Sequence, residues 1–224
     1  MLKDKKILII SPHPDDEAID CGGLVMKAKK EGGQVFVLYM ATGGSRQFTT
    51  GKGETKEDQR TLEAHKAAKY GGFNHGIAFT NISTKVDTLP QKELIEAIED
   101  VVKVYKPDIV VIPYLNSYSQ DHRAVATASV SAFRPIPEHL HPQPKLILEM
   151  EEPTSWPHAP QVNFYIDISD VFEQKLELYK CHESQLVKEP HHRSFENLRR
   201  LAGYRGSEIG VRYAEAYRLL KGQI

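Results

Sequence analysis

The sequence predicts an α/β protein with a Rossmann-like, mostly parallel sheet flanked by helices, followed by a C-terminal elaboration. Two apolar, β-branched runs at 7–10 and 35–40 flank a helical stretch over 18–31, which together form one strand–helix–strand unit. The pair Gly32-Gly33 is expected to end that helix. A further buried strand, at 109–113, is followed by another helical pattern. The length of 224 residues, without internal repeats, fits a single domain over 1–224.

The middle of the chain continues the alternation. Residues 41–56 are rich in Gly, Thr and Ser and predict a loop whose length is typical of functional segments. Helices are expected over 57–70 and 91–105, with a short strand at 77–79 between them. The strand at 109–113 leads into a helix expected over 123–133.

The last third of the chain departs from this regular order. Seven of the 13 prolines lie within residues 135–160, which predicts a Pro-rich excursion that covers one edge of the domain around a strand at 146–150. A further strand is expected at 162–168, followed by helices at about 169–182 and 207–221.

The composition excludes several classes of protein. Hydrophobic residues make up 40% and charged residues 26%, as in ordinary globular chains. A formal net charge of −1 gives no electrostatic argument for a nucleic acid or a membrane as partner. No segment approaches the roughly 18 apolar residues of a membrane span, and the run at 7–10 is too short for a signal peptide. Two cysteines, Cys21 and Cys181, make no disulfide framework, so a cytoplasmic location is expected.

The most informative motif is Ser-Pro-His-Pro-Asp-Asp-Glu at residues 11–17, directly after the first predicted strand and before a helix. Acidic residues are favoured at helix N-termini, which accounts for Asp16 and Glu17. It does not account for His13 between two prolines. Because imidazole and carboxylate together form a site for a borderline-soft divalent metal, we interpret the motif as metal-binding, with plain helix capping as the alternative.

A second cluster, Ser-Tyr-Ser-Gln-Asp-His-Arg at 117–123, also lies between a strand and a helix. Alone, Asp121 and His122 would indicate an N-cap and a surface histidine. Since both clusters follow strands of one parallel sheet, however, they are expected at the same edge. His13, Asp16 and His122 would then form a three-ligand zinc site with a position open for water. Asp15 would be a spare carboxylate, able to accept a proton.

These motifs resemble the PIG-L/LmbE-like zinc N-deacetylases. The residues 13–17 and 120–122 carry the likeness, and weaker matches extend it over most of the chain, at Arg60 with Glu63, at 167–185 and at 205–215. The resemblance implies a zinc-dependent hydrolase that removes an N-acetyl group from a small-molecule amino sugar or sugar conjugate. Relatives also suggest assembly into a homo-oligomer.

The resemblance implies roles for individual residues. His13, Asp16 and His122 match the zinc ligands, Asp15 matches the general base, and Asp121 is expected to act in catalysis beside them. Arg60 matches a residue that contacts polar groups of the substrate. The alternative for Arg60 is an ordinary helical pairing with Glu63.

The sequence departs from the family pattern at Ser119, where many members carry a histidine that donates to the oxyanion. Tyr118 is the nearest possible replacement, and His191 or His192 could reach the site from the C-terminal region; Ser119, Tyr118 and His192 are therefore expected to contact substrate. Two other functions stay open. Clustered Asp and His residues also build two-metal phosphoesterase sites, and a chain without the donor could be a non-catalytic metal- or sugar-binding member.

Overall fold

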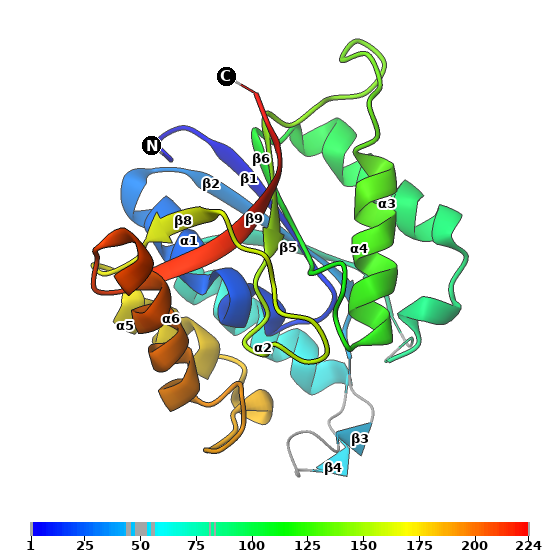
Figure 1. The fold of residues 1–224 in the computed structure, drawn as a ribbon. Coiled ribbons are helices and arrows are strands. Elements are labelled where there is room, and N and C mark those ends of the chain that lie inside the picture. The colour runs from blue at the N-terminus through cyan, green and yellow to red at the C-terminus, as the bar shows by residue number, and fades with distance from the viewer. Residues whose placement is uncertain are drawn as a thin grey trace.

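One seven-stranded sheet organises the molecule, with the strand order β5-β2-β1-β6-β7-β9-β8 (Figure 1). The computed structural model describes residues 2–43, 46–47, 53–54, 57–80, 82 and 84–223. Five strands are parallel: β5 (Asn74–Phe79), β2 (Gln34–Ala41), β1 (Lys6–Ser11), β6 (Ile109–Ile112) and β7 (Leu146–Met150). Two more, β9 (Ala214–Gly222) and β8 (Phe164–Asp167), add an antiparallel edge. The expected Rossmann-like, mostly parallel sheet is confirmed.

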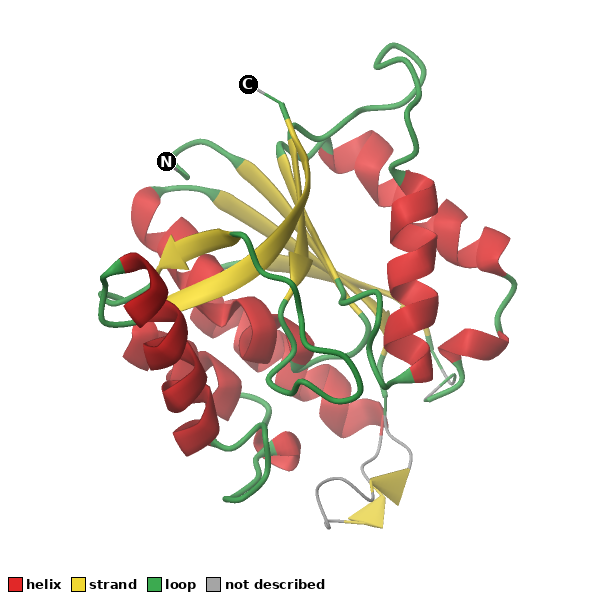
Figure 2. Ribbon diagram, viewed as in Figure 1, coloured by secondary structure: helices red, strands yellow, loops and turns green. Residues whose placement is uncertain are grey.

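Helices cover both faces of this sheet (Figure 2). One face packs against α1 (Asp16–Glu31), α2 (Glu57–Gly71), α5 (Phe172–Lys180) and α6 (Phe195–Ile209), and the other against α3 (Gln91–Tyr105) and α4 (Gln120–Ala132). Successive side chains of β1 alternate between the two cores, with Ile7 and Ile9 in one and Leu8 and Ile10 in the other. A continuous apolar run is therefore what a strand buried on both faces requires.

Short elements connect these layers. Two single-turn helices, η1 (Val86–Thr88) and η2 (Glu183–Gln185), precede α3 and α6. Within the loop expected over 41–56, the two-residue strands β3 (Arg46–Gln47) and β4 (Gly53–Glu54) pair antiparallel. Most of the rest of that loop lies outside the described residues. In the described part of the chain, no helix has the length and apolar character that crossing a bilayer requires.

Helix α1 follows β1 after a short turn and is interrupted once, at Cys21, whose φ of −137° is not helical. The interruption frees backbone N–H groups, and the buried carboxylate of Glu215 on β9 accepts from those of Gly23 (2.6 Å) and Leu24 (2.8 Å). Lys175 on α5 donates to the same carboxylate at 2.7 Å. A side chain of the C-terminal strand therefore supplies the hydrogen-bond acceptor that α1 lacks at its interruption.

The prediction of a helix over 207–221 is wrong. Helix α6 ends at Gly210, whose φ of +75° closes it in the left-handed conformation, and β9 follows. Residues 214–222 contain good helix formers, but pairing with both β7 and β8 overrides that propensity. The helix at 195–209 was not expected, although Ser194 caps it by accepting from the backbone N–H of Asn197.

Two smaller expectations also need correction. The strand at 146–150 is not part of an edge excursion, because β7 lies inside the sheet between β6 and β9. Helix α4 begins at Gln120 rather than 123, because Ser119 is its N-cap and accepts from the backbone N–H of His122. Asp121 and His122 thus belong to the first turn of the helix and do not precede it.

Candidate metal centre

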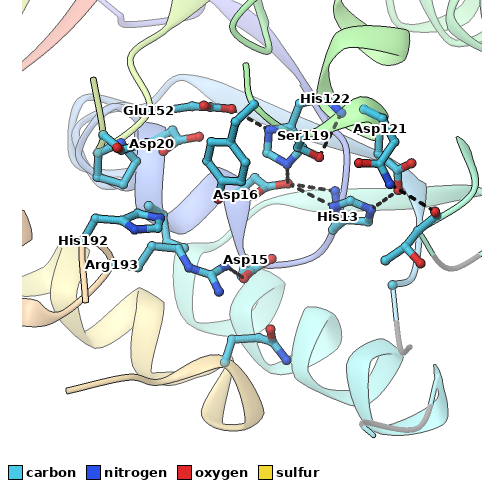
Figure 3. Close-up of a pocket in the computed structure, with 18 of the residues that line it drawn as sticks. His13, Asp15, Asp16, Asp20, Ser119, Asp121, His122, Glu152, His192 and Arg193 are labelled. Carbon is cyan, nitrogen blue, oxygen red and sulfur yellow. Dashed lines mark hydrogen bonds and ion pairs between the residues drawn. The ribbon is translucent and has the colours of Figure 1, made fainter. Parts of the chain in front are cut away.

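His13, Asp16 and His122 converge where β1 and β6 reach their carboxyl ends. His13 lies in the turn after β1, Asp16 is the first residue of α1, and His122 is in the first turn of α4. One ligand atom from each lies within 4.8 Å of the other two. Asp16 Oδ2 is 3.7 Å from His13 Nδ1 and 3.4 Å from His122 Nε2, and the three side chains point toward one another (Figure 3). The metal-ligand grouping expected from the two motifs therefore forms.

Each histidine is oriented by a carboxylate on its far side. Asp121 Oδ2 lies 2.9 Å from His13 Nε2, while its Oδ1 accepts from the backbone N–H of Val86 at 3.1 Å. Glu152 Oε1 lies 2.8 Å from His122 Nδ1. These contacts leave Nδ1 of His13 and Nε2 of His122 facing Asp16. Such carboxylate–histidine pairs are the usual support of metal-binding imidazoles, and two nitrogens with one carboxylate oxygen fit zinc.

The electrostatics of the cluster favour a cation. Burial alone would lower the pKa of His13, but hydrogen bonds with Asp121 and Asp16 overcome it and raise the pKa to about 9. His122 follows the same pattern: burial opposes protonation, while the charge of Asp16 and the bond to Glu152 raise its pKa to about 9. Although burial acts to raise the pKa of Asp16, the two histidines hold it well below its usual range. The carboxylates therefore stabilise positive charge at this position.

Asp15 lies beside the ligands but is turned toward two guanidinium groups. Its Oδ1 is 2.9 Å from Arg60 Nη2, and its Oδ2 is 3.2 Å from Arg193 Nη1. The residue is buried and has a φ of +138°, a conformation that a non-glycine residue rarely adopts. Its backbone N–H donates to Glu17 Oε2 at 3.0 Å, and Glu17 Oε1 pairs with the buried His182 Nε2 at 2.7 Å. The Glu17–His182 pair therefore supports the strained turn.

The cluster opens into a pocket of about 410 Å³. Besides the metal-ligand candidates, its wall includes all the other residues singled out in the sequence for catalysis or substrate contact: Asp15, Arg60, Tyr118, Ser119, Asp121 and His192. The structure thus brings these residues to one cavity.

Arg60 and Ser119 have local partners that the sequence did not predict. Arg60 donates to Asp15 and, through Nε, to the carbonyl oxygen of Thr42 at 3.2 Å. The alternative pairing with Glu63 does not form, because Glu63 accepts from Ser184 instead. The hydroxyl oxygen of Ser119 caps α4.

Tyr118 and His192 lie near each other, with ring centroids 6.2 Å apart. Burial raises the pKa of Tyr118 to about 12, so it keeps its phenolic proton. Burial, together with the neighbouring His191 and Arg193, lowers the pKa of His192 to about 4. Both side chains are therefore neutral at neutral pH, and each can offer a hydrogen-bond donor to the pocket.

Two site residues were missed in the sequence. Glu152 belongs to the Pro-rich stretch that was interpreted as an edge excursion, yet it closely follows β7, whose carboxyl end adjoins the site. An acid after a predicted strand is a usable signal. Arg193 gave no comparable signal, because only the fold brings a residue 178 positions away to Asp15.

Comparisons with known proteins agree with this geometry. The family model described as PIG-L, GlcNAc-PI de-N-acetylase, matches residues 8–133. The chain is 30% identical to the diacetylchitobiose deacetylase of Thermococcus kodakarensis, covering 97% of this chain and 84% of that enzyme.

Solved structures share the fold at lower identity. The conserved protein TT1542 of Thermus thermophilus superposes with a TM-score of 0.79 at 22% identity, covering 98% of this chain and 96% of that one. The 4-carboxy-2-hydroxymuconate hydratase GalB of Pseudomonas putida KT2440 reaches 0.78 at 20% identity, with 98% of both chains covered. A hydratase among these structures means that the fold alone does not decide the reaction.

Proposed function

The chain belongs to the PIG-L family of GlcNAc-PI de-N-acetylases, and from that premise we propose that it is a zinc-dependent hydrolase that removes an N-acetyl group from an amino sugar or sugar conjugate. The observation that carries the proposal is the convergence of His13, Asp16 and His122 beside Asp15 in one pocket. This donor set fits a catalytic zinc, which takes three protein ligands and keeps one position open.

His13 Nδ1, Asp16 Oδ2 and His122 Nε2 would hold the metal, with Asp121 and Glu152 fixing the two imidazole rings. Bound zinc supplies Lewis acidity toward a carbonyl oxygen and lowers the pKa of water toward about 7. Asp121 is thus a positioning residue in this proposal, because it acts on the reaction through His13.

Asp15 is the proposed general base. A carboxylate adjoining the metal ligands can accept a proton from the attacking water and return it to the departing amine nitrogen. Arg60 and Arg193 hold both of its oxygens, which fixes the direction of the carboxylate. Arg60, matched by resemblance to a substrate contact, would therefore act mainly on Asp15. Its Nη1 has no hydrogen-bond partner among the described residues and is left for a polar group of the substrate.

Tyr118 and His192 are the proposed donors to the oxyanion, in place of the histidine that Ser119 replaces. Both line the pocket and both keep a proton to donate at neutral pH. Ser119 is the weaker candidate, because its oxygen caps α4 and its side chain is short. An oxyanion donor of this kind contributes about 2.7–4 kcal/mol in other hydrolases.

The phosphoesterase alternative needs carboxylates free to bridge a second metal. Asp121, the acid that the second motif offers for that purpose, has both oxygens engaged, by His13 and by the backbone of Val86. The group of possible metal ligands among the described residues is also limited to His13, Asp16 and His122. The geometry therefore favours the single-metal hydrolase.

Acetate release tests the proposal. Zinc-loaded protein would be incubated with a panel of N-acetylglucosamine conjugates and, in parallel, with phosphate mono- and diesters. We expect acetate from at least one conjugate and no phosphate release above background. Phosphate release without acetate would favour the phosphoesterase, and neither product, with zinc bound, would favour a non-catalytic binding protein.

A further inference from the structure

Asp20 presents a buried carboxyl group to the pocket. The residue is 7% exposed, and its Oδ1 is enclosed and unpartnered among the described residues. It lies four residues, or about one helical turn, beyond Asp16 on α1 and lines the same pocket as the metal-ligand candidates. Figure 3 shows it beside Glu152, on the wall that also holds His192. A buried polar group left unpaired is unfavourable, so its place in a pocket wall calls for an explanation.

A purely structural role would give Asp20 a partner within the protein, and the nearby cation is already engaged. Lys175 donates to Glu215 at 2.7 Å, and the Glu215 carboxylate also accepts from Tyr217 and from the backbone of α1. Asp20 takes no part in that network. It is also outside the group of possible metal ligands found among the described residues, which consists of His13, Asp16 and His122.

The surroundings determine what the group can bind. Burial raises the pKa of Asp20 well above its usual range, and the charges of Asp16 and Glu152 act in the same direction. His122 and Lys175 oppose them without reversing the outcome. A carboxyl group accepts hydrogen bonds and, when it carries its proton, also donates one. A hydroxyl group, which also donates and accepts, is its natural complement.

We propose that Asp20 is a specificity-determining residue that hydrogen-bonds a hydroxyl group on a carbon next to the one that carries the acetamido group. The inference rests on the proposed deacetylase function, which brings the acetyl carbonyl to the His13–Asp16–His122 cluster. The sugar oxygens nearest that carbonyl are those on the two neighbouring carbons, C1 and C3, and one helical turn separates the cluster from Asp20. The substrate class is therefore an N-acetylated amino sugar with a free hydroxyl at one of these carbons.

Binding and hydrolysis together test this inference. Dissociation constants would be measured by calorimetry for N-acetylglucosamine and its 1-deoxy and 3-deoxy analogues, with wild-type protein, Asp20→Ala and Asp20→Asn. Hydrolysis of the same three compounds would be measured as kcat/KM. For wild-type protein we expect one deoxy analogue to bind about tenfold more weakly than the parent, the usual effect of one hydrogen bond. Asp20→Ala should abolish that preference, and Asp20→Asn should restore part of it.

Two controls separate this role from structural and metal-binding roles. Asp20→Ala should keep the wild-type zinc content and a melting temperature no lower than that of the wild type, because it removes an unpaired buried group. Equal binding of all three sugars by wild-type protein would overturn the inference, as would an unchanged preference in Asp20→Ala. Loss of bound zinc in Asp20→Ala would show a metal ligand instead. Failure of hydrolysis alone, with the binding preference intact, would count against the deacetylase function and not against Asp20.

Discussion

Asp15 and Asp16 are adjacent in the chain, yet their carboxylates have different partners. Asp16 faces the two histidines, whereas Asp15 faces Arg60 and Arg193. The two carboxylates therefore have separate surroundings, as the proposed division into ligand and base requires. It also makes the two roles separable by single substitutions.

Asp15→Asn should therefore retain zinc at about the wild-type content. Its deacetylation rate should fall by a factor of roughly 10²–10⁴, the usual contribution of general acid–base catalysis. Asp16→Asn should weaken zinc binding, and added zinc should restore part of its activity. Zinc titrations paired with rate measurements check both variants. If added zinc rescues Asp15→Asn instead, the two roles are reversed.

Glu152 offers a test that the sequence did not suggest. Glu152→Gln removes the anionic partner of His122 and should lower zinc affinity by about 10–100-fold, as in other metal sites that lose such a partner. Glu151→Gln is the matched control, because Glu151 pairs with Arg205 and not with a metal ligand. Competition titrations with a zinc chelator measure the zinc affinity of both variants. Equal affinity in the two variants would show that Glu152 does not support the metal site.

Zinc binding should depend on pH in a defined direction. Without metal, His13 and His122 have a pKa of about 9, and both imidazoles must lose a proton to bind the metal. Zinc affinity should therefore rise as the pH increases toward 9, by about tenfold per pH unit for each proton released. Affinity measured from pH 6 to 9, with proton release followed in two buffers, checks the slope. A flat profile over this range would contradict the raised pKa values.

At the scale of elements, the parallel core and its motifs could be predicted, as could β8 and α5, whereas α6 and β9 at the end of the chain could not. The runs at 7–10 and 109–113 are apolar throughout because they form strands buried on both faces. This pattern can be recognised from the sequence alone. Residues 214–222 become a strand only because β7 and β8 flank them. Arg193 was missed for a related reason, since its role arises from long-range packing and not from local pattern. Glu152 differs, because its position after a predicted strand is a local signal.

Helix α6 allows a stability test with a built-in control. A Cβ at Gly206 would lie 2.6 Å from the carbonyl oxygen of Val211 and 2.8 Å from backbone atoms of Arg212, whereas one at Gly203 would lie 4.0 Å from its nearest neighbour, Tyr213. Gly206→Ala should lower the free energy of unfolding by about 1–3 kcal/mol, because backbone must shift. Gly203→Ala should raise it by about 0.5–1 kcal/mol through helix propensity. Urea denaturation measures both, and equal shifts would contradict the packing described for this turn.

At the scale of the whole molecule, the sheet order creates the site. Strands β1, β6 and β7 are neighbours, and the residues just beyond their carboxyl ends supply His13 with Asp16, Asp121 with His122, and Glu152. Open parallel sheets bind ligands at this edge. Because a hydratase shares the fold, the side chains at this edge, and not the architecture, determine the chemistry.

The central claim is that one zinc ion, held by His13, Asp16 and His122, is required for deacetylation. The most direct measurement titrates zinc into chelator-stripped wild-type, His13→Ala and His122→Ala proteins, and reads bound zinc and released acetate in the same samples. For wild-type protein, acetate release should rise in proportion to zinc and saturate at one equivalent. Both variants should remain folded and lose most of the zinc and the activity. One equivalent of zinc retained in both variants, or acetate released by metal-free wild-type protein, would contradict the account.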